Sequence, residues 1–417
     1  MRAVVLSIGA ELVQGLRLDT HSADISRALT ALGIEVLRHV TVGDDVGAIL
    51  AALRLAAADA DLIVATGGLG PTLDDCTRDA LAEAMGQPLE PHAGATAHLE
   101  GWARSRGKTI SPSNRVQTLL PHGARMLPNP VGTAVGIEAY LGRTRVFCMP
   151  GVPVEMRTML DAEVLPRLRE AQGDRVTMIR TVRTFGMPES ILGERLADLM
   201  APGRHPHVGT AVHGGMIDVH IYASGPPAEA EALLAADAEA VRTRLGAVVY
   251  GEGDATLAES VAVLLRKARA TLAVAESCTG GLVAAKLVGV PGISEHFVEG
   301  IVAYANEAKV RDLAVDEGLI RARGAVSEPV AVAMAEGIRR RTGADVALGI
   351  TGIAGPAGGT PEKPVGTVWM ALADARGNEA MREIFTGDRA LVRERAANHA
   401  LNMVRLRLRE TGGATGD

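Results

Sequence analysis

Aromatic residues and cysteine are scarce in this chain of 417 residues. With two Trp, four Tyr and four Phe residues, its cores must be built from Ala, Val, Leu and Ile, as in parallel α/β sheets. Cys76, Cys148 and Cys278 lack the spacing of a disulfide framework or a zinc site, so we expect free thiols. No apolar run approaches the roughly 20 residues of a membrane span, and the N-terminus does not resemble a signal sequence. These absences predict a cytoplasmic protein with no membrane partner.

Positive charge is also limited. The net charge of −6 gives no general attraction to nucleic acid, so a nucleic-acid partner is not expected. Almost all basic residues are Arg, which indicates that a retained lysine performs chemistry that Arg cannot, such as losing a proton. The lysines are Lys108, Lys267, Lys286, Lys309 and Lys363.

The length and the alternation of apolar strands with amphipathic helices predict several α/β domains. Residues 1–172 are expected to form a three-layer, doubly wound domain with a parallel or mixed sheet. Residues 173–252 have the order β-α-β-β-α-β, which is typical of a small α+β module. Residues 253–412 are expected to form a second α/β domain, and residues 413–417 a disordered tail. The middle module lacks aromatic RNA-stacking strands, so a spacer or dimer arm is favoured over nucleic-acid binding.

A glycine-rich motif, T-G-G-L-G-P-T-L-D-D at residues 66–75, follows a strand expected at 61–65. A tight turn before a helix capped by Asp74 or Asp75 explains one glycine and one Asp, but not the whole motif. Binding at the carboxyl edge of a parallel sheet explains it better. A second turn, P-G-V-P at 150–153, follows a strand at 145–148, and a helix is expected at 112–120. The candidate binding residues are Gly67, Gly68, Gly70, Thr72, Pro150 and Gly151.

Carboxylates accompany both turns. Asp74, Asp75 and Glu155 would repel an anionic ligand unless a cation intervened. The sequence therefore predicts a divalent cation such as Mg²⁺ at this site, with these three residues as its ligands.

The stretch T-L-A-V-A-E-S-C-T-G-G at residues 271–281 indicates a buried strand, a polar turn and then a helix. Ser277 can simply cap that helix, as serine commonly does. The backbone N–H groups of the turn also suit an oxyanion or a phosphate. Two further strands end near Tyr304 and Lys309 and at Thr351. If these strands are parallel neighbours, all three ends meet at one edge.

Such a set can attack an amide. Ser277 would be the nucleophile, Lys309 or Tyr304 would take its proton, and Thr351 with the backbone N–H groups of the turn would hold the oxyanion. Cys278 is a rival nucleophile, although its sequence neighbours include no obvious base. No cofactor is expected here. The candidate substrate-binding residues are Thr279, Gly280, Gly281, Gly352 and Gly355.

Four motifs of the last domain, A-E-S-C-T-G-G, V-A-Y-A-N-E-A-K, T-G-I-A-G-P-A-G-G and E-K-P-V-G-T-V-W, resemble the C-terminal domain of the CinA family. That resemblance implies nicotinamide mononucleotide deamidase activity, with Ser277 as nucleophile, Tyr304 and Lys309 as its activating partners, and Thr351 in the substrate site. Ala305 stands where the family commonly has Ser.

The first 170 residues resemble the family's N-terminal domain, which is similar to molybdopterin-binding proteins and carries ADP-ribose pyrophosphatase activity. His21 stands where that domain commonly has Asn. The middle module resembles a KH domain.

We therefore expect the protein to be a homodimeric, bifunctional hydrolase of pyridine-nucleotide salvage. It would deamidate nicotinamide mononucleotide at the C-terminal site and cleave ADP-ribose with a metal at the N-terminal site. Two alternatives remain open: a non-catalytic nucleotide-sensing or competence accessory protein, and an N-terminal domain that handles a pterin.

Overall fold

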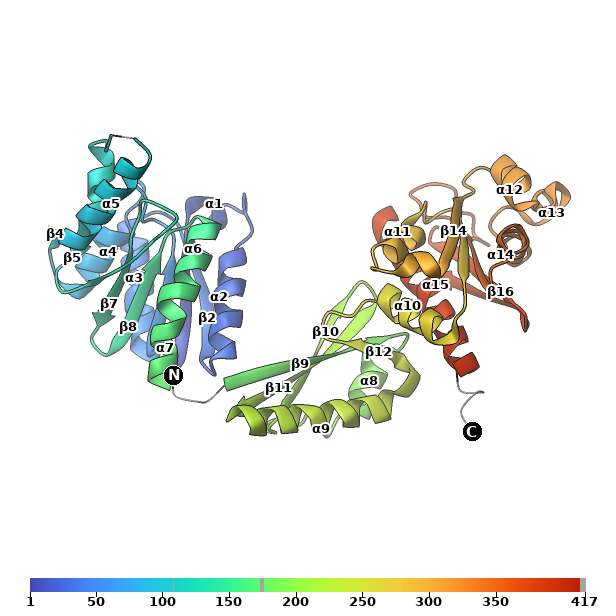
Figure 1. Ribbon diagram of the computed structural model, residues 1–417, viewed down its shortest axis with the longest axis horizontal. Helices are drawn as coiled ribbons and strands as arrows, with labels where there is room; N and C mark the ends of the chain where they lie inside the picture. Colours follow the sequence, from blue (N-terminus) through green and yellow to red (C-terminus); the bar gives the residue numbers. More distant parts are fainter. Residues whose placement is uncertain (108, 173–175, 413–417) are drawn as a thin grey trace. The chain divides into compact units, whose positions relative to one another are not determined.

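The computed structural model describes residues 1–107, 109–172 and 176–412 (Figure 1). The chain forms two compact units. One comprises Met1–Met178 with Tyr222–Leu234, and the other comprises Ile179–Ile221 with Ala235–Asp417. The expected tail at 413–417 lies outside the described residues. The domain boundaries expected from the sequence stay predictions.

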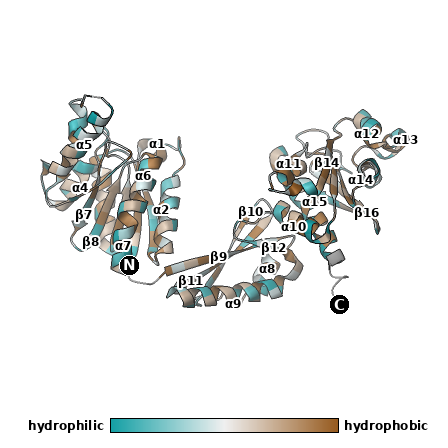
Figure 2. Ribbon diagram, in the orientation of Figure 1, coloured by the Kyte–Doolittle hydropathy of each residue, from teal (hydrophilic) through white to brown (hydrophobic). Residues whose placement is uncertain are grey.

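The N-terminal part is a six-stranded sheet between two helical layers. Apolar side chains from α2 and from α6 to α7 pack on one face, and those of α3, α4 and α5 pack on the other. Figure 2 shows hydrophobic residues along the strands between these layers. In sheet order the strands are β2 (Glu35–Val42), β1 (Arg2–Ile8), β3 (Leu62–Thr66), β8 (Thr144–Met149), β7 (Gly136–Leu141) and β6 (Arg125–Leu127). The helices are α1 (Ala10–Val13), α2 (Thr20–Ala31), α3 (Val46–Asp59), α4 (Thr77–Met85), α5 (Ala93–Ser105), α6 (Pro153–Met159) and α7 (Leu165–Gln172).

The first four strands in this order are parallel, and β7 and β6 complete the sheet in antiparallel pairing. The doubly wound three-layer fold is therefore confirmed. The helix expected at 112–120 is a shorter 3₁₀ helix, Ser113–Thr118, and its expected end is wrong, because Leu119–Pro121 forms the short strand β5, which pairs with β4 (Leu89–Pro91). Neither Asp74 nor Asp75 caps α4, whose N-cap is Cys76.

The middle module has the predicted β-α-β-β-α-β order, with its four strands in one sheet ordered β10-β11-β9-β12. Strands β12 and β9 pair antiparallel. Its elements are β9 (Val176–Phe185), α8 (Glu189–Arg195), β10 (His207–His213), β11 (Met216–Gly225), α9 (Pro227–Leu245) and β12 (Val249–Glu252).

The C-terminal part is a second three-layer α/β structure. Helices α10, α11 and α15 pack on one face of its sheet, and α12, α13 and α14 pack on the other. In sheet order the strands are β14 (Phe297–Val302), β13 (Leu272–Glu276), β15 (Val346–Gly352), β16 (Thr367–Asp374) and β17 (Gly377–Ile384). The helices are α10 (Leu257–Ala268), α11 (Leu282–Val288), α12 (Asn306–Leu313), α13 (Glu317–Arg323), α14 (Glu328–Thr342) and α15 (Arg389–Gly412).

Helix α14 lies directly on β15 at Gly349, where a Cβ atom would stand 2.3 Å from the carbonyl oxygen of Ala331. Glycine is thus required at this helix–strand contact. Within the described residues, none of the helices combines the length and the apolar character needed to cross a membrane.

Candidate active site and nucleotide site

Three parallel strand ends meet at one edge of the C-terminal sheet. β13 pairs in parallel with β14 on one side and with β15 on the other. Ser277 directly follows β13, Tyr304 lies two residues beyond β14, and Thr351 lies at the end of β15. The expectation that these ends converge is confirmed.

The central contact joins Lys309 and Ser277. The Lys309 Nζ atom lies 3.0 Å from Ser277 Oγ, 2.9 Å from the carbonyl oxygen of Ala303 and 3.0 Å from that of Tyr304. Lys309 is only 1% exposed and Ser277 only 7% exposed. Lys309 lies in the first turn of α12, which begins at Asn306, shortly after β14 ends at Val302, and this places the lysine beside the strand end.

This environment favours an amine that can act as a base. Burial lowers the pKa of the Lys309 ammonium below its ordinary value of 10.5. In the neutral form, two N–H groups can donate to the two carbonyl oxygens, and the nitrogen lone pair then faces the hydroxyl of Ser277. Lys309 is therefore placed to accept the proton of Ser277.

Cys278 has the opposite character. It is 5% exposed, and burial raises the pKa of its thiol to about 12. A thiol that stays protonated is a poor nucleophile. A Cβ atom added to Gly352 would lie 3.0 Å from the Sγ atom of Cys278, so the thiol is packed closely against Gly352.

Glu276, the last residue of β13, holds the 277–281 turn, and the sequence analysis missed it. The side chain is 1% exposed, and its two carboxylate oxygens accept hydrogen bonds from the backbone N–H groups of Val283, at 3.1 Å, and Ala284, at 2.8 Å. A carboxylate that accepts from the first turn of a helix is favourable for the helix dipole. The polar residue at the end of an otherwise apolar strand was the signal that could have identified it.

The turn itself needs glycine. Gly280 and Gly281 have φ values of +62° and +89°, which L side chains rarely adopt. Thr279 is fully buried, and its hydroxyl has no hydrogen-bond partner among the described residues. Thr279 is thus a predicted binding residue whose hydroxyl is not bonded to any other described residue.

Two arginines on α15 also reach this edge, and sequence reasoning missed both. Arg389 donates to the hydroxyl of Tyr304 at 2.9 Å and to the carbonyl oxygen of Gly355 at 2.8 Å. Arg393 donates to the carbonyl oxygen of Thr279 at 2.9 Å. Their i, i+4 spacing, which places both on one helical face, was the available signal.

Tyr304 and Thr351 are arranged differently from the sequence expectation. The Tyr304 side chain is 58% exposed and its hydroxyl bonds Arg389, whereas its backbone carbonyl contacts Lys309. The Thr351 hydroxyl donates to the carbonyl oxygen of Ala325 at 2.9 Å. Of the two candidate bases, the structure places Lys309 against Ser277.

A cavity of about 340 Å³ lies at the carboxyl ends of the N-terminal strands. A buried arginine shapes its glycine-rich loop, because Arg78 donates to the carbonyl oxygens of Leu69, at 2.7 Å, and Gly70, at 2.6 Å. The cavity brings together nearly all the binding and metal-ligating residues predicted for this domain: Gly67, Gly68, Gly70, Asp74, Asp75, Pro150, Gly151 and Glu155. Thr72 instead donates to Asp75 through its backbone N–H, at 2.9 Å, and its hydroxyl, at 2.5 Å.

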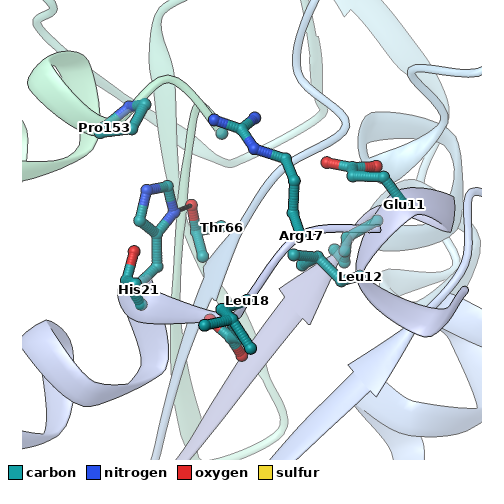
Figure 3. Close-up of a pocket in the computed structure, with 11 residues that line it drawn as sticks. Glu11, Leu12, Arg17, Leu18, His21, Thr66 and Pro153 are labelled. Carbon is teal, nitrogen blue, oxygen red and sulfur yellow. Dashed lines mark hydrogen bonds between the residues drawn. The ribbon is translucent and has the colours of Figure 1, made fainter. Parts of the chain in front are cut away.

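A smaller pocket adjoins this cavity through Ile8, Glu11 and Gly151. Figure 3 shows the His21 ring pointing at Thr66, with the Arg17 guanidinium lying between Pro153 and Glu11. His21 Nδ1 is 3.3 Å from the Thr66 hydroxyl, and burial lowers the pKa of His21 below its usual 6.5. His21 therefore contributes a neutral ring to this edge.

The carboxylates do not form a ready-made metal site. Among the described residues, no group of three His, Cys, Asp or Glu side chains is arranged to hold a metal ion. Asp75 bonds Thr72, and Glu155 accepts from Asn129 at 2.7 Å. Glu11 and Asp44 also line the cavity, so its donors are of the oxygen type that Mg²⁺ prefers. The cation stays a prediction.

Three family models match the chain: a probable molybdopterin binding domain at residues 4–170, a damage-inducible protein CinA KH domain at 179–251, and a CinA C-terminal domain at 254–408. The putative competence-damage inducible protein of Symbiobacterium thermophilum is 45% identical and covers 97% of this chain and 98% of its own. The CinA-like protein of Geobacter metallireducens is also 45% identical, covering 98% of this chain and 99% of its own.

Among solved structures, the protein CinA from Thermoplasma acidophilum is 36% identical to this chain. It matches 39% of this chain and 94% of its own, with a TM-score of 0.37.

Replacing Glu276 with Gln tests its role in the turn. Because an amide has one oxygen, one of the two backbone N–H groups would lose its acceptor and face an NH₂ group. We expect unfolding free energy to fall by about 1–3 kcal/mol. Glu259→Gln is the matched control, since exposed Glu259 uses a single oxygen in the capping box of α10. Urea denaturation of both variants measures the difference, and equal losses would contradict the role given to Glu276.

Proposed function

The chain belongs to the CinA family, and we propose that its C-terminal site deamidates nicotinamide mononucleotide to nicotinate mononucleotide and ammonia. One observation carries this proposal: the buried Lys309 amine lies 3.0 Å from the Ser277 hydroxyl. A protein that only senses a nucleotide has no need of a buried amine against a serine, which favours the enzyme over the sensor.

The proposed reaction has two halves. Ser277 Oγ attacks the carboxamide carbon while Lys309 takes the hydroxyl proton, and backbone N–H groups of the 277–281 turn stabilise the oxyanion. The C–N bond then breaks, and the proton on Lys309 goes to the departing ammonia. Water next attacks the acyl ester, Lys309 accepts its proton and returns it to Ser277 Oγ, and the carboxylate product leaves.

The α15 arginines support a phosphorylated substrate. The guanidinium groups of Arg389 and Arg393 lie around the same strand edge as Ser277, where they contact Tyr304 and Thr279. Guanidinium groups are well suited to phosphate because they present several N–H donors in a fixed plane. A mononucleotide phosphate can bind here while its base lies over the turn.

For the N-terminal cavity we propose cleavage of the pyrophosphate of ADP-ribose with a divalent cation, which would offset the charge of the lining carboxylates. A pterin ligand is the second candidate, favoured by the match of residues 4–170 to a probable molybdopterin binding domain. Assembly as a homodimer stays a prediction.

Replacing Ser277 and Cys278 one at a time tests which of these neighbouring residues is the nucleophile. Ser277→Ala is expected to lower deamidation by at least ~10³-fold, since the attacking atom is removed while binding groups remain. Cys278→Ala should keep most of the activity, because its thiol is buried and protonated. Ammonia release from nicotinamide mononucleotide measures both. If Cys278→Ala were the inactive variant, Ser277 would not be the nucleophile.

Lys309 variants test proton transfer. Lys309→Arg should be nearly as inactive as Lys309→Ala, because a guanidinium keeps its proton at every accessible pH. In the unmodified protein kcat/KM should rise with pH through the lowered pKa of Lys309, since only the neutral amine accepts a proton. Thermal melts confirm that both variants fold. Substantial activity in Lys309→Arg, or a rate that falls over this pH range, would rule out the base.

The N-terminal proposal predicts that excess chelator abolishes ADP-ribose hydrolysis. Asp74→Asn should weaken both Mn²⁺ binding in calorimetry and the hydrolysis rate, because Asp74 is an exposed carboxylate lining the cavity. Asp79→Asn is the control, since Asp79 is exposed on α4 and does not line the cavity. Full activity in chelator would exclude the metal.

A further inference from the structure

His21 lines the small pocket beside the N-terminal cavity. This pocket has a volume of about 60 Å³ and shares Ile8, Glu11 and Gly151 with the larger cavity. A water molecule occupies about 30 Å³ in the liquid, so the pocket has room for a few water molecules but not for a nucleotide. Water held here would lie directly beside a ligand of the larger cavity.

The hydrogen bonds of Thr66 fix the tautomer of His21. The Thr66 hydroxyl belongs to a side chain that is 3% exposed, and it donates its single proton to the carbonyl oxygen of Pro150 at 3.1 Å. It can therefore only accept from His21, so the Nδ1 atom, 3.3 Å away, carries the ring proton. In the neutral ring, Nε2 then has a free lone pair.

The Nε2 atom of His21 is accessible to water. It has no hydrogen-bond partner in the described part of the chain, and it is not one of the buried polar atoms that lack a partner. Figure 3 shows the ring bonded only on its Nδ1 side, to Thr66. A water molecule in the pocket can therefore donate a hydrogen bond to Nε2.

The surroundings of His21 keep its ring neutral, as a base must be. Burial lowers the pKa of His21 below 6.5, although the charges of Asp19 and Asp24 act in the opposite direction. The charges of Arg157 and Arg17 also lower this pKa. His21 is the second residue of α2, where the positive end of the helix dipole disfavours a cation.

We propose that His21 is the general base of the N-terminal site, an inference that rests on the proposed cleavage of ADP-ribose. Nε2 takes a proton from a water molecule of the small pocket while the water oxygen attacks one phosphorus atom of the pyrophosphate. The bond from that phosphorus to the bridging oxygen breaks, and the bridging oxygen leaves with the electron pair on the second phosphate. The proton on Nε2 then passes to solvent, which restores the neutral ring.

Replacing His21 with Asn tests the base. The Asn amide can still donate to Thr66, but it cannot take a proton at neutral pH. With ADP-ribose and Mn²⁺ we expect kcat to fall at least ~10²-fold. Calorimetry with the non-hydrolysable, methylene-bridged analogue of ADP-ribose should find unchanged binding. His39→Asn is the matched control, because exposed His39 also bonds a hydroxyl, that of Ser26, but lines neither pocket. Thermal melts check that both variants fold.

The protonation of His21 gives two independent measurements. Only the neutral ring accepts a proton, so kcat of the unmodified protein should rise with pH through the lowered pKa of His21. This rise should be absent from His21→Asn. Nitrogen-15 NMR of the protein without added metal, with the His21 signals assigned by their loss in His21→Asn, should show the ring proton on Nδ1 at neutral pH.

A ring proton on Nε2 would overturn the proposal, as would an equal loss of kcat in His39→Asn. Analogue binding that is at least ~10-fold weaker in His21→Asn would show that Nε2 holds a ligand hydroxyl, which also overturns the base. If the unmodified protein cleaves no ADP-ribose with added metal, the proposed function of this site fails and the base fails with it. Cleavage at the unmodified rate in His21→Asn contradicts the base alone.

Discussion

The buried contact between Lys309 and Ser277 is the constraint on which the C-terminal part depends. A lysine that is 1% exposed is expensive to bury as a cation, and the structure supplies three oxygen atoms within 3.0 Å to compensate it. Two of those oxygens belong to the backbone that leaves β14, so the strand order β14-β13-β15 is itself part of the site. Any change in which strands are neighbours would separate the amine from the hydroxyl.

Helix α15 connects the loops around this contact to other parts of the second unit through hydrogen bonds. Near its N-terminus, Arg393 bonds the 277–281 turn and Arg389 bonds the 351–364 loop. Farther along, Arg405 is 1% exposed and donates to the carbonyl oxygens of Ala247, at 2.6 Å, and Val249, at 3.2 Å, in the middle module. Burial lowers the pKa of Arg405 to about 10, which leaves it charged at neutral pH. One helix thus contacts both the 277–281 turn and the middle module.

The sequence predicted the strands that lead into the glycine-rich loops, those loops, and the convergence of the strand ends near Ser277, Lys309 and Thr351, because apolar period and turn composition are local signals. It did not predict β4, β5, β6 and β17. It did not predict that the Tyr304 hydroxyl bonds Arg389, since that contact joins residues 85 positions apart. Glu276 was missed because its partners are backbone N–H groups, so its position at the end of an apolar strand was the available signal. Asp74 or Asp75 was considered as a helix cap, but the carboxylate of Asp75 instead accepts hydrogen bonds from the backbone N–H and the hydroxyl of Thr72.

The two proposed nucleotide sites differ in the charge of the side chains that surround them. The C-terminal edge has the guanidinium groups of Arg389 and Arg393 near Ser277, so a phosphate can be held by side chains alone. The cavity of about 340 Å³ in the N-terminal part has five carboxylates among its described lining residues and neither Lys nor Arg. Backbone N–H groups of the glycine-rich loop can offset part of this charge, but they carry only partial charges. A pyrophosphate in that cavity would therefore need a cation to offset the remaining charge, whereas a ligand with less charge, such as a pterin ring, would not.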